Sequence, residues 1–426
     1  MGRELTRRYS SYFEKIGGKN PVSFLHDLYQ YGKLREFTSF MVWELFHKFR
    51  LFPEENYLRF SGNDILTLGN ENLNGSEFSE KITHFFRKRG LDILRSKHNW
   101  KRIFIDDDKV IFGCLYPQDR DLYKSIDGGD SLLFVQRFPE QIKSIFITSQ
   151  KTIFVCIQGA IYKSSDNGVS FKKILGLGSS VSCFRHNNAM TETPDKTLII
   201  GEYGNVWEKN GWRKLAYLYF SSDEGETWGR SDFLIKKGVN KHVHLVKYSS
   251  LLNKVFMADG DNYKRLWISD ALNTPDLMNP DRWKPVNRFH IQMGGYTSVV
   301  ESDESILFGT DYQGGTNFIV ETRDGKKFTK RVVPDPYRRS PIYNMVQRKS
   351  KRGNEIWASL PYSTSGTKCL LMYTPDKGKS WNRVFEYQRQ AYKVWLLSSS
   401  NDVSDALYFS IEDLKNNERV VYKIYE

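Results

Sequence analysis

The segment Tyr162-Lys163-Ser164-Ser165-Asp166-Asn167-Gly168-Val169-Ser170-Phe171 decides the fold, because the same residue classes recur in the same order further along the chain. A second copy runs from Tyr219 to Trp228, and a third runs from Met372 to Trp381, with Thr374 in place of the leading serine. In such a unit the hydroxyl and the Asp bond to the backbone of a turn, the Gly permits a positive φ, and the aromatic ring packs beneath the hairpin. The segment is therefore a folding device that joins two strands.

Three weaker copies extend the repeat. They are Lys124–Gly129, which has no closing aromatic residue, Glu321–Phe328, which is one residue short, and Trp267–Asp270, whose aromatic residue is delayed to Trp283. The aspartates of the six copies are separated by 39 to 57 residues, at positions 127, 166, 223, 270, 324 and 376. These intervals are typical of propeller blades.

Pairs of apolar runs precede the turns, so each unit contains four strands. Seven such pairs lie between Ile103 and Leu407, and they predict an all-β, seven-bladed Asp-box propeller, with six blades as the alternative. The last unit has no box and ends in a strand at residues 419–425, so we expect an N-terminal strand to complete it and close the ring. Helical spacing of apolar residues before this region predicts a helical cap over residues 1–98 and a propeller over residues 99–426.

The charge balance favours an anionic partner. The chain has 63 Lys and Arg residues against 50 Asp and Glu, which gives a formal net charge of +13 and draws the protein toward anionic molecules. No RNP, KH or helix-turn-helix signature accompanies this charge, so nucleic acid is not the expected partner. The polar N-terminus and the lack of a long apolar stretch predict a cytoplasmic protein without a membrane span. The four cysteines have no metal-ligand spacing and are expected in the reduced core.

The box turns also indicate where a binding site should lie. In a blade whose strands run A, B, C, D outward from the axis, the C-to-D turns carry the boxes, and the D-to-A and B-to-C connections share the opposite face. Four of the eight histidines fall in D-to-A connections, and Tyr recurs in the B-to-C loops. Convergence of His, Tyr, Arg and Asp at one mouth indicates a functional site there.

The boxes resemble those of the sialidase-like, BNR-repeat superfamily over roughly residues 100–426. The resemblance implies glycosidases, propeller-fold polysaccharide lyases or non-catalytic binding proteins. The nearest counterpart of the sialidase Arg-Ile-Pro motif is Arg102-Ile103-Phe104, which lacks the proline, so sialidase activity is not expected. The lyases use a His base, a Tyr acid and an Arg that neutralises the substrate carboxylate. This implies His242 or His244 as the base, Tyr203 or Tyr296 as the acid, and Arg338 or Arg339 as the clamp.

The sequence therefore predicts a carbohydrate-active enzyme that cleaves an anionic, uronate-type glycan by β-elimination or hydrolysis. Hydrolysis would require two carboxylates, which Glu202, Asp259, Asp261 and Asp311 could supply. The alternative is a non-catalytic propeller that binds glycan or protein. The expected substrate-binding residues are Glu202, His186, His290, Asp259, Asp261, Asp311, Tyr312 and Tyr362. No cofactor is expected, the alternative being a calcium or transition-metal ion near Asp259, Asp261, His242 and His244.

Overall fold

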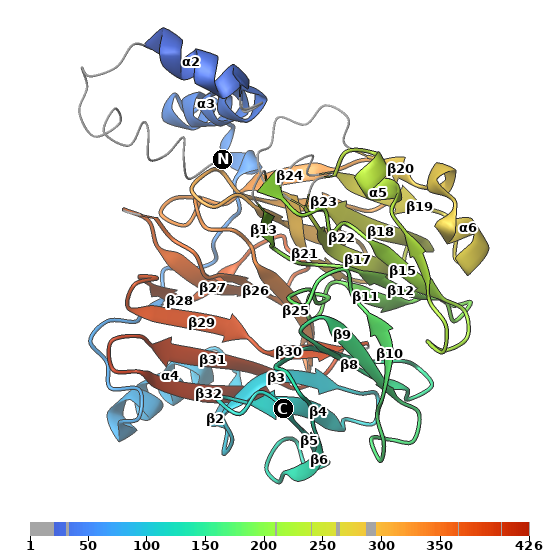
Figure 1. Cartoon of the computed structure of the whole chain (residues 1–426). Helices are drawn as coiled ribbons and strands as arrows, with labels where there is room; N and C mark the ends of the chain where they lie inside the picture. The colour runs from blue at the N-terminus through green and yellow to red at the C-terminus, as the bar shows by residue number, and fades with distance from the viewer. Residues whose placement is uncertain are drawn as a thin grey trace.

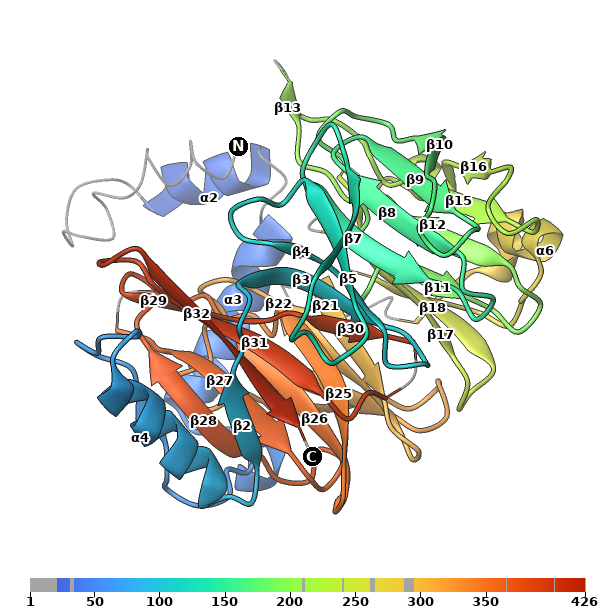
Figure 2. The same cartoon turned by 90° about the horizontal axis from the view of Figure 1, so that it is seen from below.

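The computed structural model describes residues 21–30, 34–208, 211–239, 241–260, 265–286, 295–364, 366–401 and 403–425. Seven sheets of four or five strands surround a central axis (Figures 1 and 2). The protein is therefore a seven-bladed β-propeller, as the paired apolar runs predict, and the six-bladed alternative is wrong. Inner strands such as β8 (Ile153–Ile157) are buried along their whole length, because neighbouring blades cover both faces of each sheet.

Blades 1 to 3 follow one another along the chain, each from its inner to its outer strand. Blade 1 consists of β3 (Trp100–Ile105), β4 (Ile111–Leu115), β5 (Asp121–Ser125) and β6 (Leu133–Arg137). Blade 2 consists of β7 (Ile142–Ile147), β8, β9 (Ala160–Ser164) and β10 (Lys172–Gly176). Blade 3 consists of β11 (Met190–Glu192), β12 (Leu198–Gly201), β15 (Leu218–Ser221) and β16 (Gly229–Ser231), with the hairpin β13 (Trp207–Glu208) and β14 (Gly211–Trp212) inserted after β12.

Blades 4 and 5 continue the same order. The short helix α5 (Phe233–Lys236) leads into blade 4, which consists of β17 (Val243–Ser249), β18 (Lys254–Asp259), β19 (Leu266–Ser269) and β20 (Lys284–Pro285). The helical turns α6 (Thr274–Met278) and η2 (Pro280–Arg282) separate its two outer strands. Blade 5 consists of β21 (Gly295–Glu301), β22 (Ile306–Asp311), β23 (Phe318–Thr322) and β24 (Thr329–Val332).

Blades 6 and 7 recruit strands from the N-terminal segment. Blade 6 consists of β25 (Asn344–Ser350), β26 (Gly353–Leu360), β27 (Cys369–Thr374) and β28 (Asn382–Tyr387), with β1 (Leu66–Thr67) parallel to β28 at its edge. Blade 7 consists of β29 (Tyr392–Leu396), β31 (Leu407–Asp413), β32 (Glu418–Tyr425) and β2 (Asp92–Arg95). The antiparallel pairing of β2 with β32 confirms the prediction that an N-terminal strand closes the ring.

A second connection closes the ring near its axis, where β30 (Ser398–Ser400) runs parallel to β3. At the outside, helix α4 (Ser76–Arg87) lies beside blades 6 and 7 (Figure 2). Its apolar residues Phe78, Ile82 and Phe86 are four residues apart and therefore share one helical face, and all three are at most 3% exposed. This helix completes the hydrophobic core between the two blades.

Two further helices, α2 (Pro21–Gln30) and α3 (Leu34–Lys48), lie at one end of the molecule (Figure 1), and the turn η1 (Glu54–Asn56) follows them. Trp43 of α3 stacks on Phe52 and meets the ring of Phe318 in β23 edge to face, with ring centroids 4.8 Å apart in the second pair. Helix α3 is thus anchored on blade 5. None of the helices in the described ranges is long and apolar enough to cross a membrane.

The repeated turns have the hydrogen bonds expected of them. In the first copy Ser164 Oγ donates to Asp166 Oδ1 at 2.7 Å, and the Gly168 amide donates to Ser164 Oγ at 2.9 Å. Gly168 has a φ of +90°, which explains the requirement for glycine. Equivalent bonds form in the turns of Asp127, Asp223 and Asp376, and the Asp324 turn is a shortened version. The sixth copy differs, because α6 and η2 are inserted between Asp270 and the outer strand β20.

Candidate functional site

A cavity of about 460 Å³ opens at the axis on the face opposite the box turns. We call it the funnel cavity. It lies at the D-to-A and B-to-C connections, which is the face that the sequence indicates. Its lining residues are Lys101, Arg102, Tyr116, Lys143, Cys183, Phe184, Arg185, His186, Asn188, Tyr203, Tyr343, Asn344, Trp395, Leu396, Leu397, Glu412 and Arg419. A cavity of this size is typical of small-molecule sites.

The funnel cavity is strongly basic. Five cationic side chains line it against the single carboxylate of Glu412. Arg419 pairs with Glu412 at 3.1 Å, and Lys101 pairs with Asp119. The other three cations, Arg102, Lys143 and Arg185, form no ion pair with a carboxylate in the described part of the chain. The cavity therefore retains positive charge after its internal pairs are formed.

Arg102 and Lys143 lie side by side at the starts of β3 and β7, and the Arg102 guanidinium donates to the Lys143 carbonyl. Burial, followed by repulsion from Arg102 and Lys101, lowers the pKa of the Lys143 ammonium. An ammonium whose pKa is lowered in this way would be stabilised by a bound anion. The charges thus favour an anionic ligand at this point.

Aromatic rings form the other wall of the cavity. The Arg185 guanidinium lies 4.7 Å from the centroid of the Tyr343 ring and 5.6 Å from that of Tyr203. Tyr343 contacts Trp395 and Tyr362 edge to face, at 5.6 and 5.5 Å between centroids. This cluster brings the predicted residue Tyr362 next to the cavity, and burial raises the pKa of its phenol. Stacked rings beside cations can bind a planar or apolar ligand face and an acidic group together.

The predicted residues His242 and His244 lie together with Tyr203, which lines the cavity, whereas the two histidines do not line it. The Nε2 atoms of the two histidines are 2.9 Å apart, and the Tyr203 ring centroid lies 4.1 Å from that of His242. His242 Nδ1 lies 2.7 Å from the Gly204 carbonyl, so this nitrogen must carry the proton and donate it. When both rings are neutral, His242 Nε2 accepts from His244 Nε2. Both nitrogens of His242 are therefore engaged by the protein, and both histidines are buried.

The predicted carboxylates are also occupied by internal contacts. Asp259 is fully buried and accepts from the Arg265 amide at 3.0 Å and from Trp267 Nε1 at 2.9 Å. Glu202 is fully buried as well, and its Oε2 accepts from the Tyr219 hydroxyl and the Gly178 amide. Asp311 lies at the end of β22. Burial lowers the pKa of Arg185, but Tyr343, Tyr203 and then Asp311 raise it, and the pKa of Arg185 is raised as a result.

Arg338 and Arg339, the predicted carboxylate clamp, meet an internal carboxylate. Glu44 of α3 accepts from Arg338 Nη1 at 2.7 Å and from Arg339 Nη2 at 2.8 Å. Arg338 also lies 3.4 Å from Asp335 and is only 3% exposed. Neither arginine lines the funnel cavity. In this arrangement the pair holds helix α3 on the propeller.

Two more predicted residues, Tyr296 and Tyr312, do not line the funnel cavity. Tyr296 is buried in the core of blades 4 and 5, where its ring contacts Phe308. The Tyr312 backbone is held by the Asn317 side chain. Asp261 and His290 lie outside the described residues. Within the described residues, no group of three His, Cys, Asp or Glu side chains is arranged to hold a metal ion.

His186 lines the funnel cavity, but its ring contacts the protein backbone. Its Nε2 lies 3.1 Å from the Ile103 carbonyl, and burial, followed by the charge of Arg102, lowers its pKa to about 3. In the unfolded chain a histidine has a pKa of about 6.5, so the unfolded state binds an additional proton between these values.

We expect His186 to make the protein less stable as the pH falls below about 6.5, by up to about 1.4 kcal/mol per pH unit. Replacing it by Gln, which cannot titrate, should reduce this slope in the free energy of unfolding between pH 6 and pH 4. Urea unfolding of both proteins across that range would measure the difference. Equal slopes would show that His186 does not remain neutral in the fold.

None of the five cationic residues that line the cavity was among the predicted site residues. Lys101, Arg102 and Lys143 come from blades 1 and 2, and Arg419 comes from blade 7, whereas the predicted site was drawn from blades 3 to 6. A signal was present, because Lys101, Arg102 and Lys143 occupy the first positions of inner strands and therefore face the funnel mouth. The histidines were selected because they fall in D-to-A connections, and these three cationic residues lie at the same point of their own blades.

Comparison with known proteins supports the fold alone. No family model and no curated protein matches the chain. Among solved structures, virginiamycin B lyase from Staphylococcus aureus has a TM-score of 0.52 at 11% identity, over 79% of this chain and 99% of that one. A streptogramin B lyase structure gives 0.51 at 13% identity, over 78% and 97%. A chain of a mitotic checkpoint complex gives 0.50 at 11% identity, over 78% and 91%. These proteins differ in role, so the likeness establishes a β-propeller but no activity.

Proposed function

We propose that the funnel cavity binds an anionic ligand that also presents a flat or apolar face, and that an oligosaccharide carrying uronate-type carboxylates is this ligand. The observation that carries the proposal is the convergence of Arg102, Lys143 and Arg185 beside the Tyr343 and Trp395 rings. A carboxylate would neutralise the cations, and a sugar ring could stack on the aromatic wall. The repeated boxes, which resemble those of carbohydrate-active propellers, support the same ligand class.

Cleavage of that glycan is a second proposal, favoured by the contact between the Tyr203 ring and His242 at the edge of the cavity. Elimination next to a carboxylate requires a base, an acid and a cation that neutralises the carboxylate. Tyr203 and Arg185 lie together and could serve as acid and cation. Since both nitrogens of His242 are already hydrogen-bonded, a change in these bonds would be needed before it could accept a proton. The structure therefore supports binding more directly than catalysis.

Calorimetric titration with oligogalacturonate, and with a neutral malto-oligosaccharide for comparison, tests the binding proposal. We expect the acidic ligand to bind preferentially, and Lys143→Gln to weaken its binding about tenfold or more, which corresponds to about 1.4 kcal/mol. The matched control is Lys327→Gln, because this exposed lysine lies in a box turn on the opposite face. Preferential binding that both variants weaken equally would argue against the funnel cavity as the site.

The same mixtures can be followed by ultraviolet absorbance, which rises when elimination creates unsaturated chain ends, and by a reducing-sugar assay, which also detects hydrolysis. Turnover that disappears in His242→Ala while oligogalacturonate still binds would support the catalytic proposal. Binding without either product would leave a non-catalytic glycan-binding propeller.

A further inference from the structure

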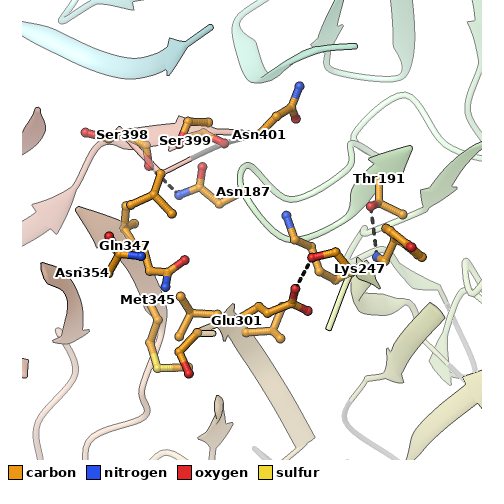
Figure 3. A pocket seen from close by; sticks show the side chains of 18 of the residues that line it. Asn187, Thr191, Lys247, Glu301, Met345, Gln347, Asn354, Ser398, Ser399 and Asn401 are labelled. Carbon is orange, nitrogen blue, oxygen red and sulfur yellow. Dashed lines mark hydrogen bonds between the residues drawn. The ribbon is translucent and has the colours of Figure 1, made fainter. Parts of the chain in front are cut away.

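A second cavity, of about 540 Å³, lies at the other end of the propeller axis, on the face that carries the box turns. We call it the box-face cavity. The A-to-B turns and the distal ends of the inner strands form it, and Figure 3 shows its labelled side chains around a central space. Its volume falls within the range of roughly 300–1,000 Å³ that is typical of small-molecule sites. The proposed glycan site makes no use of it, because Arg185, His186 and Tyr203 belong to the opposite mouth.

Two buried oxygen atoms in the box-face cavity accept no hydrogen bond from the described residues. Glu301 Oε1 accepts from Ser250 Oγ at 2.5 Å and from the Leu251 amide at 3.0 Å, but Glu301 Oε2 is buried without a donor. Asn187 Nδ2 donates to the Ser398 carbonyl at 2.8 Å, but Asn187 Oδ1 is likewise buried without a donor. Figure 3 shows these two side chains on different sides of the space. Because a buried acceptor without a donor is costly, both atoms favour a ligand that donates hydrogen bonds.

The rest of the lining indicates what kind of donor fits. Most of the polar groups are amides and hydroxyls, which both donate and accept, among them Gln347, Asn354, Ser399 and Asn401. Two carboxylates of the lining are already neutralised, since Glu192 lies 3.4 Å from Lys196 and Asp303 lies 2.8 Å from Lys377. Among the other charged lining residues, the ammonium of Lys247 offsets the formal charge of one of the two carboxylates Glu301 and Asp107, so one formal negative charge is left in the cavity. The lining thus has little net charge, and most of its polar groups both donate and accept hydrogen bonds. It matches an uncharged ligand whose groups also donate and accept.

We propose that the box-face cavity binds a neutral polyhydroxylated molecule, such as a monosaccharide, a disaccharide or a sugar alcohol. Its hydroxyl groups would donate to Glu301 Oε2 and Asn187 Oδ1, and its oxygen atoms would accept from Lys247 and from the amide of Gln347. The site is independent of the funnel cavity, so one end of the axis takes an acidic ligand and the other takes an uncharged one.

Saturation-transfer NMR on the full chain tests this assignment with glucose, galactose, mannose, N-acetylglucosamine, maltose and mannitol, and with spermidine as a cationic probe. We expect saturable binding of at least one neutral polyol. Glu301→Gln should weaken it at least tenfold, because the amide oxygen can keep the bonds to Ser250 and Leu251 while the amide nitrogen replaces the free acceptor with a donor. Gln347→Leu should have a similar effect. The matched controls are Glu140→Gln and Gln136→Leu, which make the same changes outside both cavities.

Polyol binding that both box-face variants weaken, while the controls and Lys143→Gln leave it unchanged, supports the assignment. The assignment fails if none of the polyols binds, or if spermidine binds in their place. It also fails if Lys143→Gln removes polyol binding while Glu301→Gln leaves it intact, because the sugar would then occupy the funnel cavity. Since the funnel proposal is tested with an acidic ligand and a different variant, the two proposals can fail separately.

Discussion

Replacing Phe86 by Ala should lower the free energy of unfolding by about 3–5 kcal/mol, the usual cost of removing a buried phenylalanine ring. Phe86 lies on helix α4 with no exposed surface, and its ring centroid is 5.9 to 6.4 Å from those of Trp357, Phe385 and Phe409. These three rings belong to blades 6 and 7, which meet where the N-terminal segment closes the ring. The substitution would therefore leave a cavity at the closure point.

Urea unfolding of the full chain, followed by tryptophan fluorescence, would measure this loss. The matched control is Phe49→Ala, because Phe49 is 63% exposed just after helix α3, and a surface change of this kind usually alters stability by no more than about 0.5 kcal/mol. If the two variants were equally stable, helix α4 would not be a part of the folded core.

Replacing Glu355 by Ala should destabilise the protein by a similar amount, about 3–5 kcal/mol, because it removes one partner of a buried ion pair. Arg348 is fully buried, and its Nε and Nη2 donate to the two oxygens of Glu355 at 3.0 and 3.3 Å. Glu355 Oε2 also accepts from Trp357 Nε1 at 3.0 Å. The variant would deprive a buried guanidinium and a buried indole of this acceptor at once.

The double variant Arg348→Met, Glu355→Leu provides the comparison. It removes both charges and fills their space with apolar atoms, a replacement that is often neutral or stabilising in other proteins. We therefore expect the double variant to be more stable than Glu355→Ala in the same urea experiment. A double variant that is the less stable of the two would show that Arg348 stabilises the fold through other contacts.

The fold could be predicted from the sequence because its decisive interactions are local. The hydroxyl, Asp and Gly of each box bond to one another within five residues, as Ser164, Asp166 and Gly168 do, so the motif is readable in a single stretch. The Asp270 copy was predicted with its aromatic residue delayed to Trp283, and the structure places the helical turns α6 and η2 between Asp270 and the buried Trp283.

The presence of a cavity on the funnel face agrees with the sequence, because alternation of strand direction decides which connections share a face. The partners of individual side chains could not be predicted. Arg338 and Arg339 lie on the predicted face, yet they meet Glu44, which is 294 residues away from Arg338 in the sequence. Such long-range contacts have no local pattern. His242 and His244 were grouped correctly because both lie at the start of one strand, whereas the cations of the cavity are dispersed over four blades.

Ring closure by strand β2 affects the order in which the chain can fold during synthesis. Residues 92–95 leave the ribosome more than 300 residues before their partners in β32, residues 418–425. During this interval the hydrogen-bonding edge of β2 and the apolar face of α4 lack the strands on which they pack in the folded protein. Exposed strand edges and apolar faces favour aggregation or recruitment of a chaperone. Blades 1 to 5 use consecutive strands and can form as they emerge, but blade 7 waits for the last residues. Removal of β32 alone would therefore leave β2 without its partner even though blades 1 to 5 can form.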